Sequence, residues 1–342
     1  MNTKKKRGVV LMNLGSPDST AVNDVRKYLD EFLMDERVID SPYLLRSILV
    51  KGIINPFRAP KSAEAYSSIW TKDGSPLVHI TRLLRDALQQ QMADIPVVIS
   101  MRYGSPSMKA SYDELYSAHP DLEEVILLPL YPHYAMSSFE TASVHAQKVH
   151  ADGKYPFSIK VVRPFYNHPS YINALAESMR PHIAGNDTHI LFSYHSIPER
   201  HILKSDITER HCLQVADCCH KASPAHNYCY RHQCYETTWL VAEKLGLPKE
   251  RYSVSFQSKL GRSAWLTPAT TARMDELPKE GIKDLLVICP SFVSDCLETL
   301  EEIAIRENEN FMHAGGRSFG YIPCMNTQPL WVATVKQLVT EI

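Results

Sequence analysis

Glycine is scarce in this chain, at 13 of 342 residues, and no segment carries a Gly-x-Gly-x-x-Gly or Walker-type loop. Such loops cradle a nucleotide pyrophosphate by close approach of the backbone, which requires glycine. Basic and acidic residues nearly cancel, 37 against 38, so no global field attracts nucleic acid or an anionic bilayer. These absences argue against a dinucleotide enzyme and a nucleic-acid-binding protein, and they favour a compact small molecule as the partner.

Long hydrophobic runs are also absent, since no stretch reaches the roughly 18 uninterrupted apolar residues of a transmembrane helix. The basic start, 1–7, passes at once into a short apolar run, 8–11, that is too early for a secretory signal. We therefore expect a cytoplasmic protein, at most peripheral to the inner membrane. Thiols stay reduced in that compartment, so the eight cysteines are expected to be free, catalytic or metal-bound.

The sequence does contain a regular alternation of short apolar runs and helix-period stretches. The runs are rich in Val, Ile and Leu, which is typical of parallel strands covered on both faces. The alternation predicts an α/β protein with two doubly wound parallel sheets, that is, two Rossmann-like lobes with a cleft between them. The predicted strands are 8–15, 97–104, 123–132, 159–165, 189–195, 252–257, 284–290 and 319–323. The predicted helices are 22–33, 80–92, 107–119, 171–182, 235–245 and 297–308.

The length and the 44% hydrophobic content allow two domains. We expect an N-terminal lobe over 1–166 and a C-terminal lobe over 167–325 that contains a cysteine-rich insert at 201–234. The remainder, 326–342, is predicted to be a helix that packs back on the N-terminal lobe. The two lobes repeat one pattern of elements, without sequence identity between them.

Functional residues are expected at the strand ends, because ligands of open α/β sheets bind beyond the carboxyl ends of the strands. His195 closes one strand, where an imidazole can titrate near neutral pH or ligate a metal, although a merely structural histidine is as good an explanation of it alone. Glu298 and Glu302 lie four residues apart on one helix face. Two like charges there repel unless a metal or a shared proton lies between them. Glu301 is better explained as a complement to the helix dipole.

Aromatic and basic side chains mark two further strand ends. Trp265 lies in the loop after strand 252–257, where a Trp is more often a core anchor but can also stack on a flat ligand. Arg102 and Tyr103 add a fixed charge and a phenol at the end of strand 97–104.

Five of the eight cysteines fall within 23 residues, interleaved with histidines and with few apolar residues. Such a segment cannot fold on a core of its own, which favours a metal that organises it over inert buried cysteines. Zinc and an iron–sulfur cluster both accept four thiolates, and zinc is the default for mixed Cys and His. The cysteines are Cys212, Cys218, Cys219, Cys229 and Cys234.

Eight short blocks carry a family resemblance. They are LMNLGSP (11–17), GSPL (74–77), MRYG (101–104), LYP (130–132), SYHSIP (193–198), FQSKLG (256–261), WL (265–266) and DCLETL (295–300). In composition and order they resemble the signature blocks of the ferrochelatases, and they span nearly the whole chain.

The resemblance implies a lyase that holds a porphyrin between two Rossmann-like lobes and inserts ferrous iron as a substrate, with release of two protons. This is the last step of heme biosynthesis. It implies that His195 and Glu298 are the catalytic residues that take a proton or meet the iron, with Glu302 as a relay. The positions that the resemblance assigns to porphyrin binding are Leu14, Arg102, Tyr103, Tyr131 and Trp265.

Leu14 favours protoporphyrin IX as the substrate, because relatives that act on coproporphyrin III often carry a Tyr at this position. Coproporphyrin III is the alternative substrate. A related alternative function is a chelatase that inserts cobalt or nickel into another tetrapyrrole. A two-lobed tetrapyrrole-binding protein is the non-enzyme alternative. The hydrophobic, membrane-made substrate suggests transient contact with a membrane or with an upstream enzyme of the heme pathway, and the oligomeric state stays open.

The resemblance also bears on the cysteine segment, because a subset of bacterial ferrochelatases holds a [2Fe-2S] cluster in an internal insert of this kind. It therefore favours the cluster over zinc. The expected ligands are Cys212, Cys219, Cys229 and Cys234. Cys218 is the substitute for Cys219, because adjacent cysteines seldom both bind one small cluster.

Overall fold

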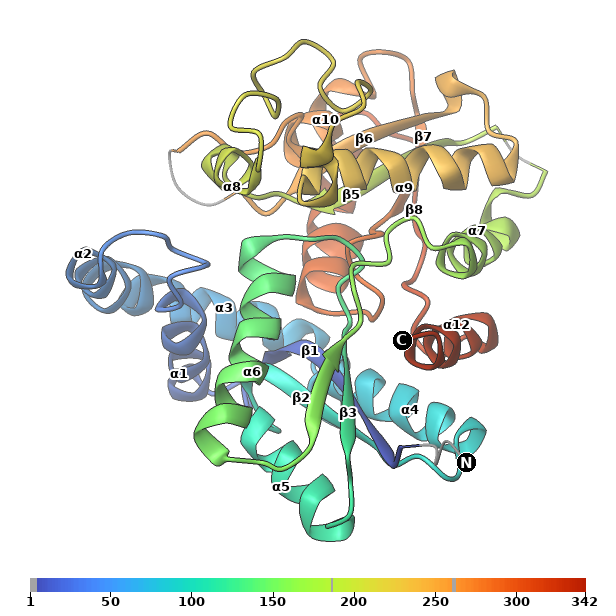
Figure 1. Ribbon diagram of the computed structural model, residues 1–342. Helices are drawn as coiled ribbons and strands as arrows, with labels where there is room; N and C mark the ends of the chain where they lie inside the picture. Colours follow the sequence, from blue (N-terminus) through green and yellow to red (C-terminus); the bar gives the residue numbers. More distant parts are fainter. Residues whose placement is uncertain (1–4, 186, 260–262) are drawn as a thin grey trace. The chain divides into compact units, whose positions relative to one another are not determined.

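The computed structural model describes residues 5–185, 187–259 and 263–342 (Figure 1). The first four residues of the basic start, and Leu260 and Gly261 of the FQSKLG block, lie outside the described residues. By its internal contacts the chain divides into two compact units. The first comprises Met1–Leu130, Met136–Arg163 and Val332–Ile342, and the second comprises Tyr131–Ala135 and Pro164–Trp331.

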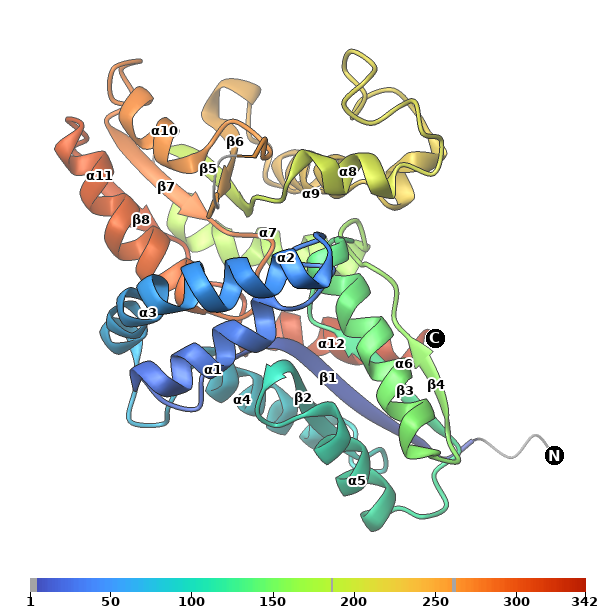
Figure 2. The same cartoon turned by 90° about the vertical axis from the view of Figure 1, so that its left-hand side faces the viewer.

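The first unit is built on a parallel sheet of order β2-β1-β3-β4, with helices on both of its faces (Figures 1 and 2). Its strands are β1 (Arg7–Ser16), β2 (Val97–Gly104), β3 (Glu124–Pro129) and β4 (Ser158–Val161). Its helices are α1 (Val22–Leu33), α2 (Tyr43–Ser47), the π-helix η1 (Ile48–Ile54), α3 (Asn55–Ile69), α4 (Pro76–Gln91), α5 (Met108–Ala118), the π-helical turn η2 (Met136–Glu140) and α6 (Thr141–Gly153). Val9 to Met12 of the inner strand β1 are fully buried, as expected for a strand covered on both faces.

The second unit repeats this arrangement, with a parallel sheet of order β6-β5-β7-β8. Its strands are β5 (His189–His195), β6 (Tyr252–Gln257), β7 (Asp284–Ile288) and β8 (Ser318–Tyr321). Its helices are α7 (Pro169–Ile183), α8 (Glu199–Ser205), the 3-10 turn η3 (Pro224–Asn227), α9 (Tyr230–Leu245), the 3-10 turn η4 (Lys249–Arg251), α10 (Thr270–Glu276), the π-helix η5 (Glu298–Glu307) and α11 (Asn308–His313). The last helix is α12 (Pro329–Thr340). No helix in the described part of the chain is both long and apolar enough to cross a membrane.

The predicted fold class is confirmed, because both sheets are parallel and all eight predicted strands form. Several strand ends differ from the prediction by one to four residues, and the largest difference is at β4, which ends at Val161, whereas the apolar pattern extends the strand to residue 165. The ladder hydrogen bonds stop just beyond the strand, with the bond from the Val162 N–H to the Leu127 carbonyl. Pro164 has no N–H with which to continue them.

Each sheet has a point at which successive connections leave in opposite directions. In the second sheet this point lies between β5 and β7, because the chain goes from β5 to β6 on one side and to β7 and β8 on the other. Ligands of open α/β sheets bind beyond the strand ends at such a switch point. In this unit the strand that ends there is β5, and its last residue is His195.

Candidate active site

His195 is held at the end of β5 by its backbone and by its ring. Its N–H donates to the Ser291 hydroxyl at 3.3 Å, and its carbonyl accepts from the Tyr230 hydroxyl at 2.8 Å. Ring Nδ1 lies 2.7 Å from the Ser196 carbonyl oxygen. Because a carbonyl only accepts, Nδ1 carries the proton and the neutral ring has its lone pair on Nε2. That nitrogen can act as a base or as a metal ligand.

Glu298 and Glu302 lie in the first half of η5, the helix that follows β7 on the other side of the same switch point. Glu302 is 8% exposed. Its carboxylate accepts from the Ser258 hydroxyl and lies 3.9 Å from the Arg306 guanidinium. Burial raises the pKa of Glu302 to about 7, and the Ser258 hydrogen bond opposes part of that rise. Glu302 can therefore hold or release a proton near neutral pH.

Trp265 lies beside the segment that continues from His195. It forms an antiparallel bridge with Pro198, and the next N–H, from Leu266, donates to the Ile197 carbonyl at 3.1 Å. Its indole N–H donates to the Ser263 hydroxyl at 3.0 Å. Trp265 therefore lies next to the segment that follows His195 at the end of β5, although Trp265 and His195 are 70 positions apart in the sequence.

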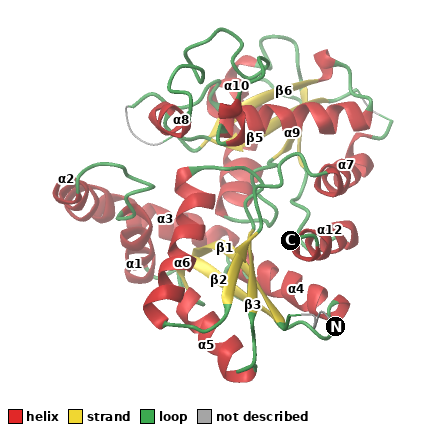
Figure 3. Cartoon of the chain, in the orientation of Figure 1, coloured by secondary structure: helices red, strands yellow, loops and turns green. Residues whose placement is uncertain are grey.

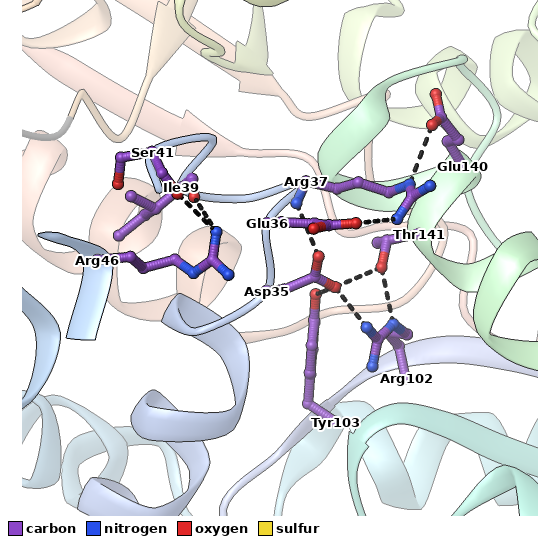
Figure 4. Close-up of polar contacts among 10 residues, drawn as sticks. All are labelled: Asp35, Glu36, Arg37, Ile39, Ser41, Arg46, Arg102, Tyr103, Glu140 and Thr141. Atoms are coloured by element: carbon purple, nitrogen blue, oxygen red, sulfur yellow. Dashed lines mark hydrogen bonds and ion pairs between the residues drawn. The ribbon is translucent and has the colours of Figure 1, made fainter. Parts of the chain in front are cut away.

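Arg102 and Tyr103 lie on β2 in the first unit, and both bind Asp35 (Figure 4). The Tyr103 hydroxyl donates to Asp35 at 2.9 Å, and the Arg102 guanidinium forms an ion pair with the same carboxylate. Arg102 Nε donates to the Thr141 hydroxyl at 2.9 Å, and that hydroxyl donates to Asp35. Burial alone would raise the pKa of Asp35, but hydrogen bonds from Thr141 and the Arg37 N–H, with the Arg102 charge, lower it below its ordinary value. The carboxylate therefore stays charged.

This network leaves Arg102 and Tyr103 with little free surface. The Arg102 side chain is 13% exposed and its guanidinium lies 4.3 Å from the centre of the Tyr103 ring, which is fully buried. The buried Tyr103 ring therefore packs against the Arg102 guanidinium. Sequence reasoning did not find Asp35, which lies 67 positions from Arg102 and outside every signature block.

Leu14 and Tyr131 are close in sequence to the ends of β1 and β3. Leu14 is the third-last residue of β1 and is partly exposed. Tyr131 follows the last residue of β3 by two positions, belongs to the second unit, and is 9% exposed. Both lie near carboxyl strand ends, where the sequence predicts functional residues.

The cysteine-rich segment runs mostly as loops and turns between α8 and α9 (Figure 3). Asp206 organises its first part, since one carboxylate oxygen accepts the backbone N–H groups of His211 and Cys212, each at 2.8 Å. The other oxygen accepts from the Thr208 hydroxyl at 2.7 Å. Burial acts to raise the pKa of Asp206, but these hydrogen bonds outweigh it and hold the pKa well below its usual range. The buried Asp206 carboxylate thus holds together by hydrogen bonds a segment that has few apolar residues.

Three thiols of this segment influence one another electrostatically. Interaction with the Cys212 and Cys219 thiols lowers the pKa of Cys229, and interaction with Cys229 together with burial raises the pKa values of Cys212 and Cys219. The sulfur of Cys218 accepts the Leu213 N–H at 3.4 Å.

Cys234 lies on the buried face of α9. Burial raises its pKa well above the ordinary value, and a hydrogen bond with Tyr230 acts in the opposite direction. Among the described residues, no group of three or more His, Cys, Asp or Glu side chains is arranged to hold a metal ion. By its chemistry, a set of four or five cysteines suits a thiolate-bound metal group.

The interleaved histidines bond to the backbone of the adjacent cysteines. Ring nitrogens of His211 and His226 lie 2.8 and 2.9 Å from the Cys218 carbonyl, and one of His232 lies 2.8 Å from the Cys219 carbonyl. The His226 and His232 rings stack with centroids 3.5 Å apart. These contacts orient the loop, and they favour thiolates over imidazoles as metal ligands.

Comparison with known proteins identifies the family of the chain. The family described as Ferrochelatase matches residues 6–342. The chain is 48% identical over 328 residues to the ferrochelatase of Opitutus terrae, covering 95% of this chain and 94% of that protein. It is 46% identical over 331 residues to that of Pseudomonas fluorescens strain Pf0-1, covering 96% of each. Among solved structures, SirB from Bacillus subtilis with Fe3+ shares the fold over 98% of this chain and 95% of its own, with a TM-score of 0.56 and 10% identity. The chain therefore belongs to the ferrochelatase family, the lyases that insert ferrous iron into a porphyrin in heme synthesis.

Proposed function

We propose that His195 and Glu298 carry out the insertion of ferrous iron into protoporphyrin IX. The observation that carries this proposal is the place of His195, at the end of β5 and at the switch point of the second sheet. A porphyrin must lose two pyrrole protons as the metal enters, so the reaction needs a base. His195 meets that need, because its Nδ1–H is bonded to the Ser196 carbonyl and the lone pair is on Nε2. The same nitrogen could instead meet the iron.

Glu298 and Glu302 conduct iron or protons between the porphyrin and solvent. The raised pKa of Glu302, about 7 as a result of burial, lets its carboxyl exist in both protonation states at neutral pH. A group of that kind accepts a proton from one neighbour and returns it to another at little cost. Glu298 is partly exposed and also binds the ion in this proposal.

The residues proposed to bind the porphyrin are Leu14, Arg102 and Tyr103 of the first unit and Tyr131 and Trp265 of the second. Aromatic and apolar side chains packed on a macrocycle can hold it ruffled, so that its nitrogens point toward the incoming metal. Arg102 fits this role because Asp35 and Tyr103 fix its guanidinium. Tyr103 acts through Arg102, since its own ring is fully buried.

Initial rates with two porphyrins test the substrate assignment. Purified protein and ferrous iron are mixed anaerobically with protoporphyrin IX or coproporphyrin III, and the loss of porphyrin fluorescence is followed. We expect kcat/KM to be larger for protoporphyrin IX, because Leu14 offers no hydroxyl toward the metal. A larger value for coproporphyrin III would reverse the assignment, and faster insertion of cobalt or nickel than of iron would contradict the metal.

The cysteine segment is proposed to hold a [2Fe-2S] cluster through Cys212, Cys219, Cys229 and Cys234, with Cys218 as the substitute ligand and zinc as the alternative metal. The thiols of Cys212, Cys219 and Cys229 shift one another's pKa values, and ring nitrogens of His211, His226 and His232 are bonded to backbone carbonyls. When bound, the group would cross-link the loop and supply a one-electron redox centre. The proposed steps of iron insertion do not use it.

We further propose that the α2–η1–α3 surface contacts a membrane that contains anionic lipid. Large apolar side chains are exposed along it, with Leu44 70% and Phe57 74% exposed, and Figure 2 shows α2 and α3 following one another along the first unit. Lys51, Arg58 and Lys61 are exposed among them, and no acidic residue lies between positions 41 and 63. Exposed apolar and basic side chains together are typical of interfacial helices. The apolar residues are Tyr43, Leu44, Leu45, Ile48, Leu49, Ile53 and Phe57.

Flotation with lipid vesicles tests this contact. We expect the protein to float with vesicles containing phosphatidylglycerol, more weakly with pure phosphatidylcholine, and less at high salt because the basic residues are screened. Leu44→Asp combined with Phe57→Asp should abolish flotation. Leu83→Asp, at a side chain 42% exposed on α4, is the matched control and should float normally. Equal flotation of the double variant and the native protein would contradict the proposal.

A further inference from the structure

Gln257, the last residue of β6, contacts both elements that carry the proposed catalytic residues. It pairs in register with His195 across β5 and β6, and its carbonyl accepts the Ser196 N–H at 2.8 Å. Its side-chain oxygen accepts from the Ser193 hydroxyl at 2.7 Å, and its amide nitrogen donates to the Glu298 carbonyl at 3.1 Å. Gln257 is 2% exposed. A buried amide bonded at both ends is fixed in place.

Ser258, the next residue, makes the second contact with η5. Its hydroxyl donates to a carboxylate oxygen of Glu302. The residue has a φ of +68°, a left-handed conformation that is unfavourable for a residue with a Cβ. Such strain persists only where surrounding contacts impose it, and it occurs preferentially at functional sites. Here it accompanies a hydroxyl directed at one of the proposed relay carboxylates.

We infer that Gln257 and Ser258 are positioning residues that hold the first half of η5, and with it Glu298 and Glu302, at a fixed place relative to His195. Two consecutive residues bind η5 at positions 298 and 302, and one of them also flanks His195. The β6 end therefore sets the spacing between the base and the carboxylates. This inference rests on the proposed roles of Glu298 and Glu302.

Two substitutions at Ser258 distinguish the effect of its hydroxyl from the effect of its strained backbone. Ser258→Ala removes the hydroxyl and keeps the strain, whereas Ser258→Gly removes both, because glycine tolerates a positive φ. We expect the melting temperature of Ser258→Gly to lie above that of Ser258→Ala. Both variants should nevertheless lose about tenfold in kcat with an unchanged KM for porphyrin, the effect of one lost hydrogen bond to a charged group. Gln257→Met, which keeps the length and removes both polar contacts, should lower kcat in the same way.

The matched control is Thr271→Val. Thr271 donates to Glu307, another carboxylate of η5, at 2.6 Å, so the variant also removes one hydroxyl from that helix and should keep kcat within about twofold. Glu298→Gln and Glu302→Gln are measured in the same assay. If the two Glu→Gln variants lower kcat while both Ser258 variants keep the native rate, the positioning role of Ser258 is wrong but the proposed roles of Glu298 and Glu302 are unaffected. If neither Glu→Gln variant lowers kcat, the proposed roles of the carboxylates are wrong, and the positioning role is wrong with them.

Discussion

Replacing His195 with alanine is expected to lower kcat for iron insertion by at least about a hundredfold, the range that a positioned acid–base group contributes. The reason is geometric: the Ser196 carbonyl fixes the Nδ1 proton, so the reactive lone pair is on Nε2, and alanine offers no replacement. Iron-dependent loss of porphyrin fluorescence under anaerobic conditions measures the effect. Porphyrin affinity, measured without iron, should change much less.

His189→Ala is the matched control for this experiment. His189 is the first residue of the same strand, and its ring lies 2.8 Å from the Ser253 hydroxyl, at the opposite end of the sheet from the switch point. We expect its kcat to stay within about twofold of the native value, as for most substitutions away from a site. Native rates for both His195→Ala and Glu298→Gln would exclude the proposed pair.

Replacing Cys229 with serine should remove all of the visible absorption and acid-labile sulfide that a [2Fe-2S] cluster gives the native protein. Cys229 is one of the proposed ligands, and the thiols of Cys212 and Cys219 both affect its pKa, so its loss should prevent the cluster from being held. Without its cross-link the loop should also become sensitive to trypsin after the exposed Lys221. Absorbance, sulfide analysis and limited proteolysis measure these changes.

Two more serine variants identify the fourth ligand. We expect Cys219→Ser to lose the absorption and Cys218→Ser to keep it, and the opposite pattern would replace Cys219 by Cys218 as the ligand. Cys324→Ala, a buried cysteine outside the segment, should retain the native spectrum. A colourless native protein that holds zinc and no sulfide, when prepared anaerobically, would rule out the cluster.

The sheets were predictable because buried parallel strands have a distinctive composition. Runs such as 8–15 and 189–195 each contain a block of consecutive apolar residues, and the structure places them as the inner strands β1 and β5. The family could also be identified from the sequence, since the signature blocks keep their order along the chain, and the match to the Ferrochelatase family over residues 6–342 confirms it.

The helices show where the sequence is less informative. The helix predicted at 297–308 forms, but as the π-helix η5, because apolar spacing does not distinguish hydrogen bonds to the fifth residue from those to the fourth. The α2–η1–α3 stretch was not predicted at all. Its exposed apolar side chains and internal prolines mask the period of an amphipathic helix.

The candidate site residues were proposed from strand ends, signature blocks, the spacing of Glu298 and Glu302 and the run of cysteines. Asp35 and Ser258 were not, because they make their contacts across 67 and 44 positions. No local pattern encodes such pairings. Ser258 does lie within a block, but its positive φ and its bond to Glu302 are tertiary properties.

The division of the chain into units has a consequence for its synthesis. The first unit includes Val332–Ile342, which the ribosome makes after the whole second unit. Domains fold as they emerge, so the β1–β4 sheet can assemble early, but its unit stays incomplete until residues 332–342 have been made. A nascent chain stalled before residue 332 would contain the whole second unit and only part of the first, so completion of the first unit has to wait for the helix α12.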